Sequence, residues 1–200
     1  MAVANKEKNY MFLHLYKCGG NSLRSMLHGE EILGVHCHAY DLMRHCFTQG
    51  LTEFWNSAYK FTFIRNPFDW QVSLYHYILR AESHIDHLFV KGHTLLEYLE
   101  FQRDVRMKIT THGANKYDTL TGFLTDKEGN MLVDHIYRYE DYDNEVKRLC
   151  DRIGEPFTEV PKLNVSQNRE RDYRKYYDAK TRKLVEDMFG EDLRNFGYSF

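Results

Sequence analysis

The sequence lacks the features that mark exported, membrane-spanning and general nucleic-acid-binding proteins. No run of residues approaches the roughly 20 apolar residues that a helix needs to cross a bilayer. Residues 1–8 are polar, with no apolar run of signal length behind them. The formal net charge is −2 at pH 7, whereas a general nucleic-acid binder has a basic excess. We therefore expect a cytoplasmic protein that binds neither membranes nor nucleic acids.

Cysteine is also scarce, and none of the cysteines belongs to a C-x-x-C motif. They are Cys18, Cys37, Cys46 and Cys150. Zinc ribbons and thioredoxin-type sites need that motif, so neither is indicated. In a cytoplasmic protein we expect all four as reduced thiols. One metal site stays open as an alternative, because His36, His38 and His45 with Cys37 or Cys46 could bind Zn²⁺.

The remaining composition is typical of a globular α/β protein. Hydrophobic residues make up 42% of the chain and charged residues 28%, so the chain can bury a core. Segments rich in β-forming residues predict buried strands at 10–15 and 59–64, and alternation of polar and apolar residues predicts a third strand at 134–139. Helical periodicity is found at 22–27, 69–80, 94–102, 140–153 and 172–189. Without a linker or repeat, we predict a single domain over residues 1–200, with a central parallel sheet flanked by helices.

A glycine pair follows the first predicted strand, within the segment Lys17-Cys18-Gly19-Gly20-Asn21-Ser22. Glycine lets the backbone approach a ligand closely, and the N–H groups at a helix start attract phosphate or sulfate. Lys17 adds a positive charge, and Asn21 and Ser22 add polar side chains. The segment is not a Walker A motif, in which the lysine follows the second glycine. It is either an anion-binding loop or an ordinary turn with an exposed lysine.

A second loop begins where the predicted strand at 59–64 ends. Arg65-Asn66-Pro67 breaks the strand, and Asp69 is placed to cap the helix that follows. The Arg65 guanidinium suits a phosphate, and the Ser73 hydroxyl could reach the same anion. In the alternative, Arg65 pairs with Asp69 and Ser73 is an ordinary helical serine. Because ligands bind at the carboxyl ends of parallel strands, we expect both loops at one edge of the sheet.

Together these segments resemble the sulfotransferases that use 3′-phosphoadenosine 5′-phosphosulfate (PAPS). Residues 15–23 are similar to the family's 5′-phosphosulfate loop, P-K-T-G-G-T-S. Residues 63–75 are similar to its 3′-phosphate motif, R-[DN]-P-x-x-R-x-x-S-x-Y. Residues 134–141 resemble its strand ending in R-x-E-[DN], and 163–166, 176–178 and 196–198 resemble the C-terminal pattern of its carbohydrate branch. The matches cover nearly the whole chain in the family's order.

The resemblance implies a P-loop-like three-layer fold and sulfuryl transfer from PAPS to a hydroxyl, with a saccharide as the expected acceptor and no metal. It implies that Lys17 and the loop residues Cys18, Gly19, Gly20, Asn21 and Ser22 hold the 5′-phosphosulfate. Arg65 and Ser73 then hold the 3′-phosphate. The chain departs from the pattern where Tyr16 replaces a proline, Cys18 and Asn21 replace threonines, and Trp70 replaces the second arginine.

Two histidines lie between the two loops. His36 and His38 share a face if they lie on a strand, and imidazole suits a general base near neutral pH. The pair resembles the H-G-H segment of the uronyl 2-O-sulfotransferases, whose second histidine is the base. The resemblance implies His38 as the base and His36 as a supporting contact. The alternatives are histidines that only line a pocket, or a carboxylate base such as Glu30 or Glu53.

A basic stretch near the C-terminus is a candidate contact for the nucleotide or for an anionic acceptor. Residues 162–183 carry eight Lys or Arg and three Asp or Glu, a net charge of +5. Arg169 and Arg171 are the residues that we expect to touch PAPS, and the rest fits a solvated helix face. Acceptor specificity is expected from residues 81–118.

Two other functions compete with the sulfotransferase hypothesis. One is a module on the same fold that binds a nucleotide or a partner without catalysis. The other is a small nucleotide or sugar kinase, which needs a Walker A motif that the sequence does not contain. The oligomeric state is left open.

Overall fold

The computed structural model describes residues 2–34, 36–104, 119–157 and 169–200 of the chain. The chain forms two compact units. The first unit comprises residues 1–65 and 122–164, and the second comprises residues 66–121 and 165–200. The single domain expected over residues 1–200 stays a prediction.

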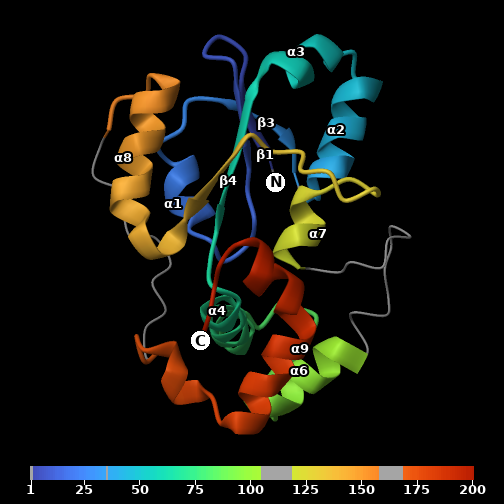
Figure 1. The fold of residues 1–200 in the computed structure, drawn as a ribbon, viewed down its shortest axis with the longest axis vertical. Coiled ribbons are helices and arrows are strands. Elements are labelled where there is room, and N and C mark those ends of the chain that lie inside the picture. The colour runs from blue at the N-terminus through green and yellow to red at the C-terminus, as the bar shows by residue number, and fades with distance from the viewer. Residues whose placement is uncertain (1, 35, 105–118, 158–168) are drawn as a thin grey trace. The chain divides into compact units, whose positions relative to one another are not determined.

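The first unit is built on a mixed five-stranded sheet in the order β3-β1-β2-β4-β5 (Figure 1). Its strands are β1 (Ala2–Asn5), β2 (Tyr10–Leu13), β3 (Glu30–Leu33), β4 (Tyr59–Ile64) and β5 (His135–Arg138). β2, β4 and β5 pair in parallel, and β1 is antiparallel to both β2 and β3. Strands β2 to β5 therefore all run in one direction. The predicted α/β class is confirmed, and the prediction of a parallel sheet is wrong for β1.

Helices lie on both sides of these strands. Those of the first unit are α1 (Gly20–Arg24), α2 (Ala39–Thr48), α3 (Thr52–Ser57) and α8 (Tyr142–Ile153), with the end of α7 (Leu120–Leu124). In Figure 1, α1 and α8 lie on one side of the strands, and α2 and α3 lie on the other. Every side chain of β2 is buried, as are the last four of β4. Burial on both faces explains why these two strands are rich in apolar and β-forming residues.

One buried carboxylate ties the β1–β2 turn to the end of α8. Glu155 accepts hydrogen bonds from Tyr10 Oη at 3.1 Å and from Lys8 Nζ at 2.7 Å, and it contacts His28 Nδ1 at 3.0 Å. Its side chain is only 3% exposed. Burial by itself raises the pKa of this carboxyl, but the hydrogen bonds from Lys8, His28 and Tyr10 outweigh it and hold the pKa below its ordinary value. The folded state therefore favours the ionised carboxylate.

We expect Glu155→Gln to lower the free energy of unfolding by about 1 to 2 kcal/mol at pH 7, because hydrogen bonds to a buried charge are lost. A depressed carboxyl pKa stabilises the fold above the unfolded-state pKa, and this stability disappears as the pH falls through the folded-state pKa. The gap between wild type and variant should therefore close in acid. Urea unfolding from neutral to acidic pH measures it, with exposed Glu7→Gln as the control. A gap that does not change with pH would contradict this explanation.

The second unit is helical over its described residues. It contains α4 (Pro67–Arg80), α5 (His87–Lys91), α6 (Leu95–Asp104), the 3₁₀ helix η3 (Tyr173–Tyr176) and α9 (Ala179–Asn195), and α7 begins in it. α4 packs against α5, α6 and α9. The helix predicted at 172–189 is corrected, because η3 and an N-cap at Asp178 precede α9. Among the described residues, no helix combines the length and the hydropathy that crossing a bilayer requires.

The start of α4 corrects another prediction. Asn66, not Asp69, caps this helix, because the Asn66 side-chain oxygen accepts a hydrogen bond from Phe68 N at 3.1 Å. Pro67 takes the first helical position, where its missing N–H leaves no hydrogen bond unmade. The Asp69 carboxylate is thereby available for a different contact within the second unit.

Candidate functional site

The carboxyl ends of the three parallel-paired strands lie at one edge of the sheet in the first unit. β2 leads into the loop with Lys17, β4 ends beside Arg65, and β5 leads into the 3₁₀ helix η2 (Tyr139–Asp141). Arg65 Nη1 donates to the Lys17 carbonyl oxygen at 3.2 Å. The Arg65 guanidinium carbon lies 4.2 Å from the centre of the Tyr139 ring. The prediction that the first loop and Arg65 share one edge is confirmed.

The first loop has a special backbone. Lys17 and Gly19 both have left-handed conformations, with φ of 62° and 81°. A Cβ at position 19 would lie 2.5 Å from a ring carbon of Tyr142, so the backbone and the available space both require glycine there. The Tyr142 hydroxyl donates to the Gly19 carbonyl at 2.7 Å, and burial raises the Tyr142 pKa, so the hydroxyl keeps its proton. The α8 residue Tyr142 thus holds the loop in place.

Gly20 is required for a different reason, which sequence reasoning missed. A Cβ at position 20 would collide with the imidazole of His14. His14 is 5% exposed, and its Nδ1 has no hydrogen-bond partner among the described residues. Burial, with a further contribution from His36, lowers the pKa of His14 to about 3, so the ring is neutral. The sequence signal for this contact was His14 itself, a single polar residue near the end of the apolar segment 10–15.

The helix after the loop is shorter and earlier than predicted. α1 covers only Gly20–Arg24, instead of 22–27. A single turn has a small dipole, so attraction of an anion to this edge depends on the charges of Lys17 and Arg65. Asn21 is exposed and Ser22 is buried. Burial raises the pKa of the Cys18 thiol to about 12, so this substituted position adds no negative charge.

The two histidines do not share a strand, and this prediction is corrected. His38 is the N-cap residue of α2, and His36 lies in the connection from β3. His38 Nδ1 lies 3.0 Å from the Gly122 carbonyl oxygen, and His36 Nδ1 lies 3.0 Å from the His14 carbonyl oxygen. A carbonyl can only accept, so each neutral ring carries its proton on Nδ1 and its lone pair on Nε2. Both rings therefore have the tautomer of an Nε2 base.

Aromatic contacts join these histidines to the first loop. The His38 ring stacks on Phe123 at 4.4 Å between ring centres. Tyr16 places its ring edge-on to both His36 and Phe123, at 5.8 and 5.6 Å. Partial desolvation lowers the pKa of His36 and so favours its neutral form. Because β3 runs in the same direction as β2, β4 and β5, the connection that carries the histidines leaves the same edge of the sheet.

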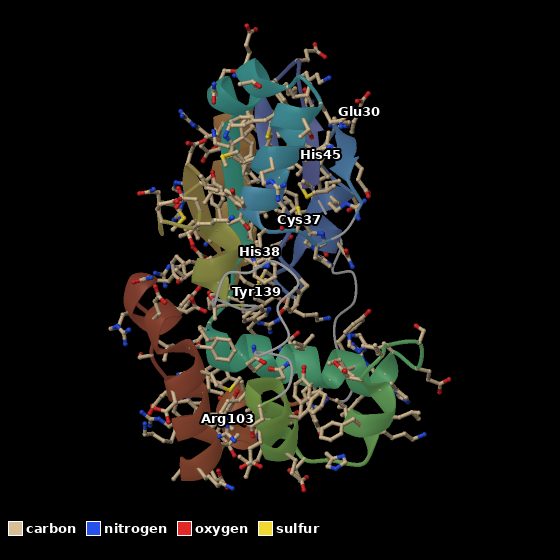
Figure 2. The ribbon with its side chains drawn as sticks, turned by 90° about the vertical axis from the view of Figure 1, so that its right-hand side faces the viewer. Glu30, Cys37, His38, His45, Arg103 and Tyr139 are labelled. Atoms are coloured by element: carbon tan, nitrogen blue, oxygen red, sulfur yellow. The ribbon has the colours of Figure 1, made fainter. Side chains whose placement is uncertain are left out.

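The alternative bases lie elsewhere in the first unit, and the alternative zinc ligands His36, His38 and His45 are not brought together. Figure 2 shows His38 and Tyr139 near one end of this unit, with His45 farther along α2 and Glu30 farther still. Glu30 begins β3 and Glu53 is on α3, just before β4, so both belong to the amino-end edge of the sheet. Over the described ranges, no group of three His, Cys, Asp or Glu residues is placed to hold a metal ion.

The remaining predicted residues belong to the second unit. Ser73 lies on α4 and is 4% exposed. One helical turn earlier on the same face, Asp69 forms an ion pair with Arg169, whose side chain is 8% exposed. Arg171 is exposed. Trp70, at the position of the family's second arginine, is fully buried with its ring edge-on to Phe189.

The basic stretch is described only in part, because residues 162–168 lie outside the described residues. Most of the described basic side chains pair with acidic neighbours at the surface. The pairs are Arg174–Asp172, Lys175–Glu170, Lys180–Glu100, Arg182–Glu186 and Lys183–Asp187. This pairing fits the solvated helix face that was the alternative for most of the stretch.

Comparison with known proteins adds no assignment to this geometry. No family model, no curated protein and no solved structure matches the chain.

Proposed function

We propose that the chain is a PAPS-dependent sulfotransferase that acts on a hydroxyl group, with a saccharide as the acceptor. The observation that carries the proposal is the hydrogen bond from Arg65 to the Lys17 carbonyl. It brings the phosphosulfate-type loop and the arginine of the 3′-phosphate-type motif together at the carboxyl edge of parallel strands, where ligands of α/β sheets bind. We also propose a P-loop-like three-layer arrangement for this part of the chain.

The residues fit a doubly anionic co-substrate. Lys17, supported by Cys18, Gly19, Gly20, Asn21 and Ser22, holds the 5′-phosphosulfate in this proposal. Arg65 and Ser73 hold the 3′-phosphate, and Arg169 and Arg171 are the further residues that contact the nucleotide. Two observations favour these roles: the neutral Cys18 thiol does not repel an anion, and Arg169 is anchored on the face of α4 that carries Ser73.

In the proposed reaction, PAPS supplies a sulfuryl group on a phosphate leaving group. The acceptor oxygen attacks sulfur in line, so that the new O–S bond forms as the bond from sulfur to the 5′-phosphate oxygen breaks. His38 Nε2 takes the proton of the acceptor hydroxyl as general base. The Lys17 ammonium offsets the charge that develops on the departing phosphate. His36, bonded through Nδ1 to His14, lines the acceptor side as a supporting contact.

We expect 3′,5′-adenosine bisphosphate to raise the melting temperature, whereas 5′-AMP and ADP should not. A ligand that binds only the folded state adds about 2.7 kcal/mol at 100 times its Kd. For a chain of this size, that corresponds to a shift of roughly 5 to 10 °C. Thermal unfolding of the full chain with each nucleotide measures the effect. Ser73→Ala should reduce the shift, whereas exposed Ser57→Ala should not.

Two outcomes contradict the proposal in different ways. An equal shift with ADP would favour a kinase or a general nucleotide-binding module. No shift with any nucleotide would mean that neither loop has the proposed role. A selective shift together with no turnover on any hydroxyl acceptor would favour the non-catalytic module.

A further inference from the structure

A polar groove lies at the amino-end edge of the sheet in the first unit, opposite the edge that carries Lys17 and Arg65. It has a volume of about 900 Å³ and lies where the β1–β2 turn meets the amino ends of β4 and β5. The lining residues that carry its chemistry are Asn56, Tyr59, Lys60, Tyr137, Arg148 and Arg152, with Lys8 also lining it. β4 runs from Tyr59 at the groove toward Arg65, a distance of about 20 Å at 3.3 Å per residue. The groove is therefore separate from the candidate sulfotransferase site.

The groove is basic, and most of its cations already have partners. Lys8 pairs with Glu155, Lys60 pairs with Asp134 at 3.2 Å, and Arg148 pairs with Glu145 at 3.2 Å. Arg152 differs, because no carboxylate within the described residues pairs with it. Its guanidinium carbon lies 5.0 Å from the centre of the Tyr59 ring, and the side chain is exposed. Arg152 can therefore offer its N–H donors to a ligand anion.

A hydroxyl donor lies beside this guanidinium. The hydroxyls of Tyr59 and Tyr137 are 3.1 Å apart. The two groups have two protons, and their mutual hydrogen bond uses one. The second proton belongs to whichever hydroxyl accepts that bond, and no protein acceptor for it lies among the described residues. Tyr59 is half-buried and lines the groove, so a ligand oxygen in the groove is placed to accept from this hydroxyl pair.

Both tyrosine rings of the groove already contact other side chains. The Arg152 guanidinium lies over the Tyr59 ring, and Tyr59 is also stacked with Phe61 at 5.7 Å between ring centres. Tyr137 is stacked on Phe63 at 5.1 Å and contacts His135 at 4.4 Å. Nucleic-acid grooves use open aromatic faces to stack bases. This groove instead offers hydrogen-bonding edges, from hydroxyls, the side-chain amide of Asn56 and a guanidinium, and such edges suit the hydroxyls and acid groups of a sugar.

We infer that this groove binds an acidic saccharide, whose sulfate or carboxylate is held by Arg152 and by the hydroxyl pair of Tyr59 and Tyr137. The groove is open and larger than a single ion needs, so it takes a saccharide of several units. This binding site does not depend on the proposed sulfotransferase activity, and it lies too far from His38 to hold the reacting hydroxyl.

Titration calorimetry on the full chain tests the assignment with four probes. They are a tetrasaccharide of uronic acid and sulfated hexosamine, its desulfated and carboxyl-reduced counterpart, inorganic sulfate and single-stranded DNA. Only the acidic tetrasaccharide should bind tightly. Arg152→Gln should weaken its binding about tenfold or more, because a hydrogen bond to a charged group is lost, and Tyr59→Phe should weaken it severalfold. Arg44→Gln is the matched control, since Arg44 is also exposed and lies 6.0 Å from a tyrosine ring, that of Tyr40.

Each contrary result overturns a defined part of the inference. Equal weakening by Arg44→Gln would mean non-specific attraction to positive charge. Equal affinity for inorganic sulfate would remove the saccharide from the assignment, and tighter binding of single-stranded DNA would assign the groove to nucleic acid. Loss of the response to 3′,5′-adenosine bisphosphate would not affect this test, so failure of the proposed function and failure of this site are distinguishable.

Discussion

Lys17→Gly is expected to lower turnover by about 10²- to 10³-fold while changing the melting temperature little. The ammonium of Lys17 is the charge that we propose to offset the leaving phosphate, and no other lysine belongs to that loop. The backbone of Lys17 is left-handed, with φ of 62°. Glycine relieves roughly 1 kcal/mol of strain there, which about cancels the greater entropy that it gives the unfolded chain. We therefore expect the variant to lose its activity and to keep its fold.

The rate of bisphosphate release with an acceptor that the wild type sulfates measures this effect, with the melting temperature recorded in parallel. Lys17→Ala should lose as much turnover as Lys17→Gly, because both variants lack the ammonium. Lys6→Ala, an exposed lysine in the β1–β2 turn, is the matched control and should keep full activity. Wild-type turnover in both Lys17 variants would sink the sulfotransferase proposal.

The parts of the structure that could be predicted are those in which local sequence and burial agree. β2 and β4 are rich in apolar and β-forming residues because both faces of the sheet are covered. A loop with a glycine pair follows β2, and Arg65-Asn66-Pro67 follows β4. Two parallel strands with such endings place their loops at one edge, and the Arg65 hydrogen bond to the Lys17 carbonyl confirms that expectation. The helix predicted at 140–153 also ends where expected, because α8 ends at Ile153 and the next residue, Gly154, has a left-handed backbone.

Two of the missed features depend on contacts distant in the sequence, and a third was a local signal. Ala2–Asn5 is too short and too weakly apolar to indicate a strand, and it becomes one because β2 and β3 pair with it on both sides. His38 has no signal as an N-cap residue, since its side chain makes no cap hydrogen bond and bonds to Gly122 instead, 84 residues away. Asn66 before Pro67 was a readable cap signal that the Asp69 prediction overlooked.

The contacts of His38 lead to the second large expected effect. We expect His38→Ala to lower turnover by about 10²- to 10⁴-fold, the range for removal of a general base. The response to 3′,5′-adenosine bisphosphate should be unchanged, because we propose that His38 serves the acceptor and that Lys17 and Arg65 hold the nucleotide. Stacking on Phe123 and the bond to Gly122 fix the ring so that Nε2 carries the lone pair.

Steady-state rates and nucleotide-dependent melting of His38→Ala, measured side by side, separate catalysis from binding. His45→Ala is the matched control, since His45 lies on the same α2 helix and should keep wild-type turnover. If His38→Ala loses bisphosphate binding as well as turnover, His38 has a structural role at the carboxyl edge of the sheet. If His38→Ala keeps both turnover and bisphosphate binding, His38 is not the general base. The alternatives Glu30 and Glu53 could not replace it at this site, since both belong to the opposite edge of the sheet.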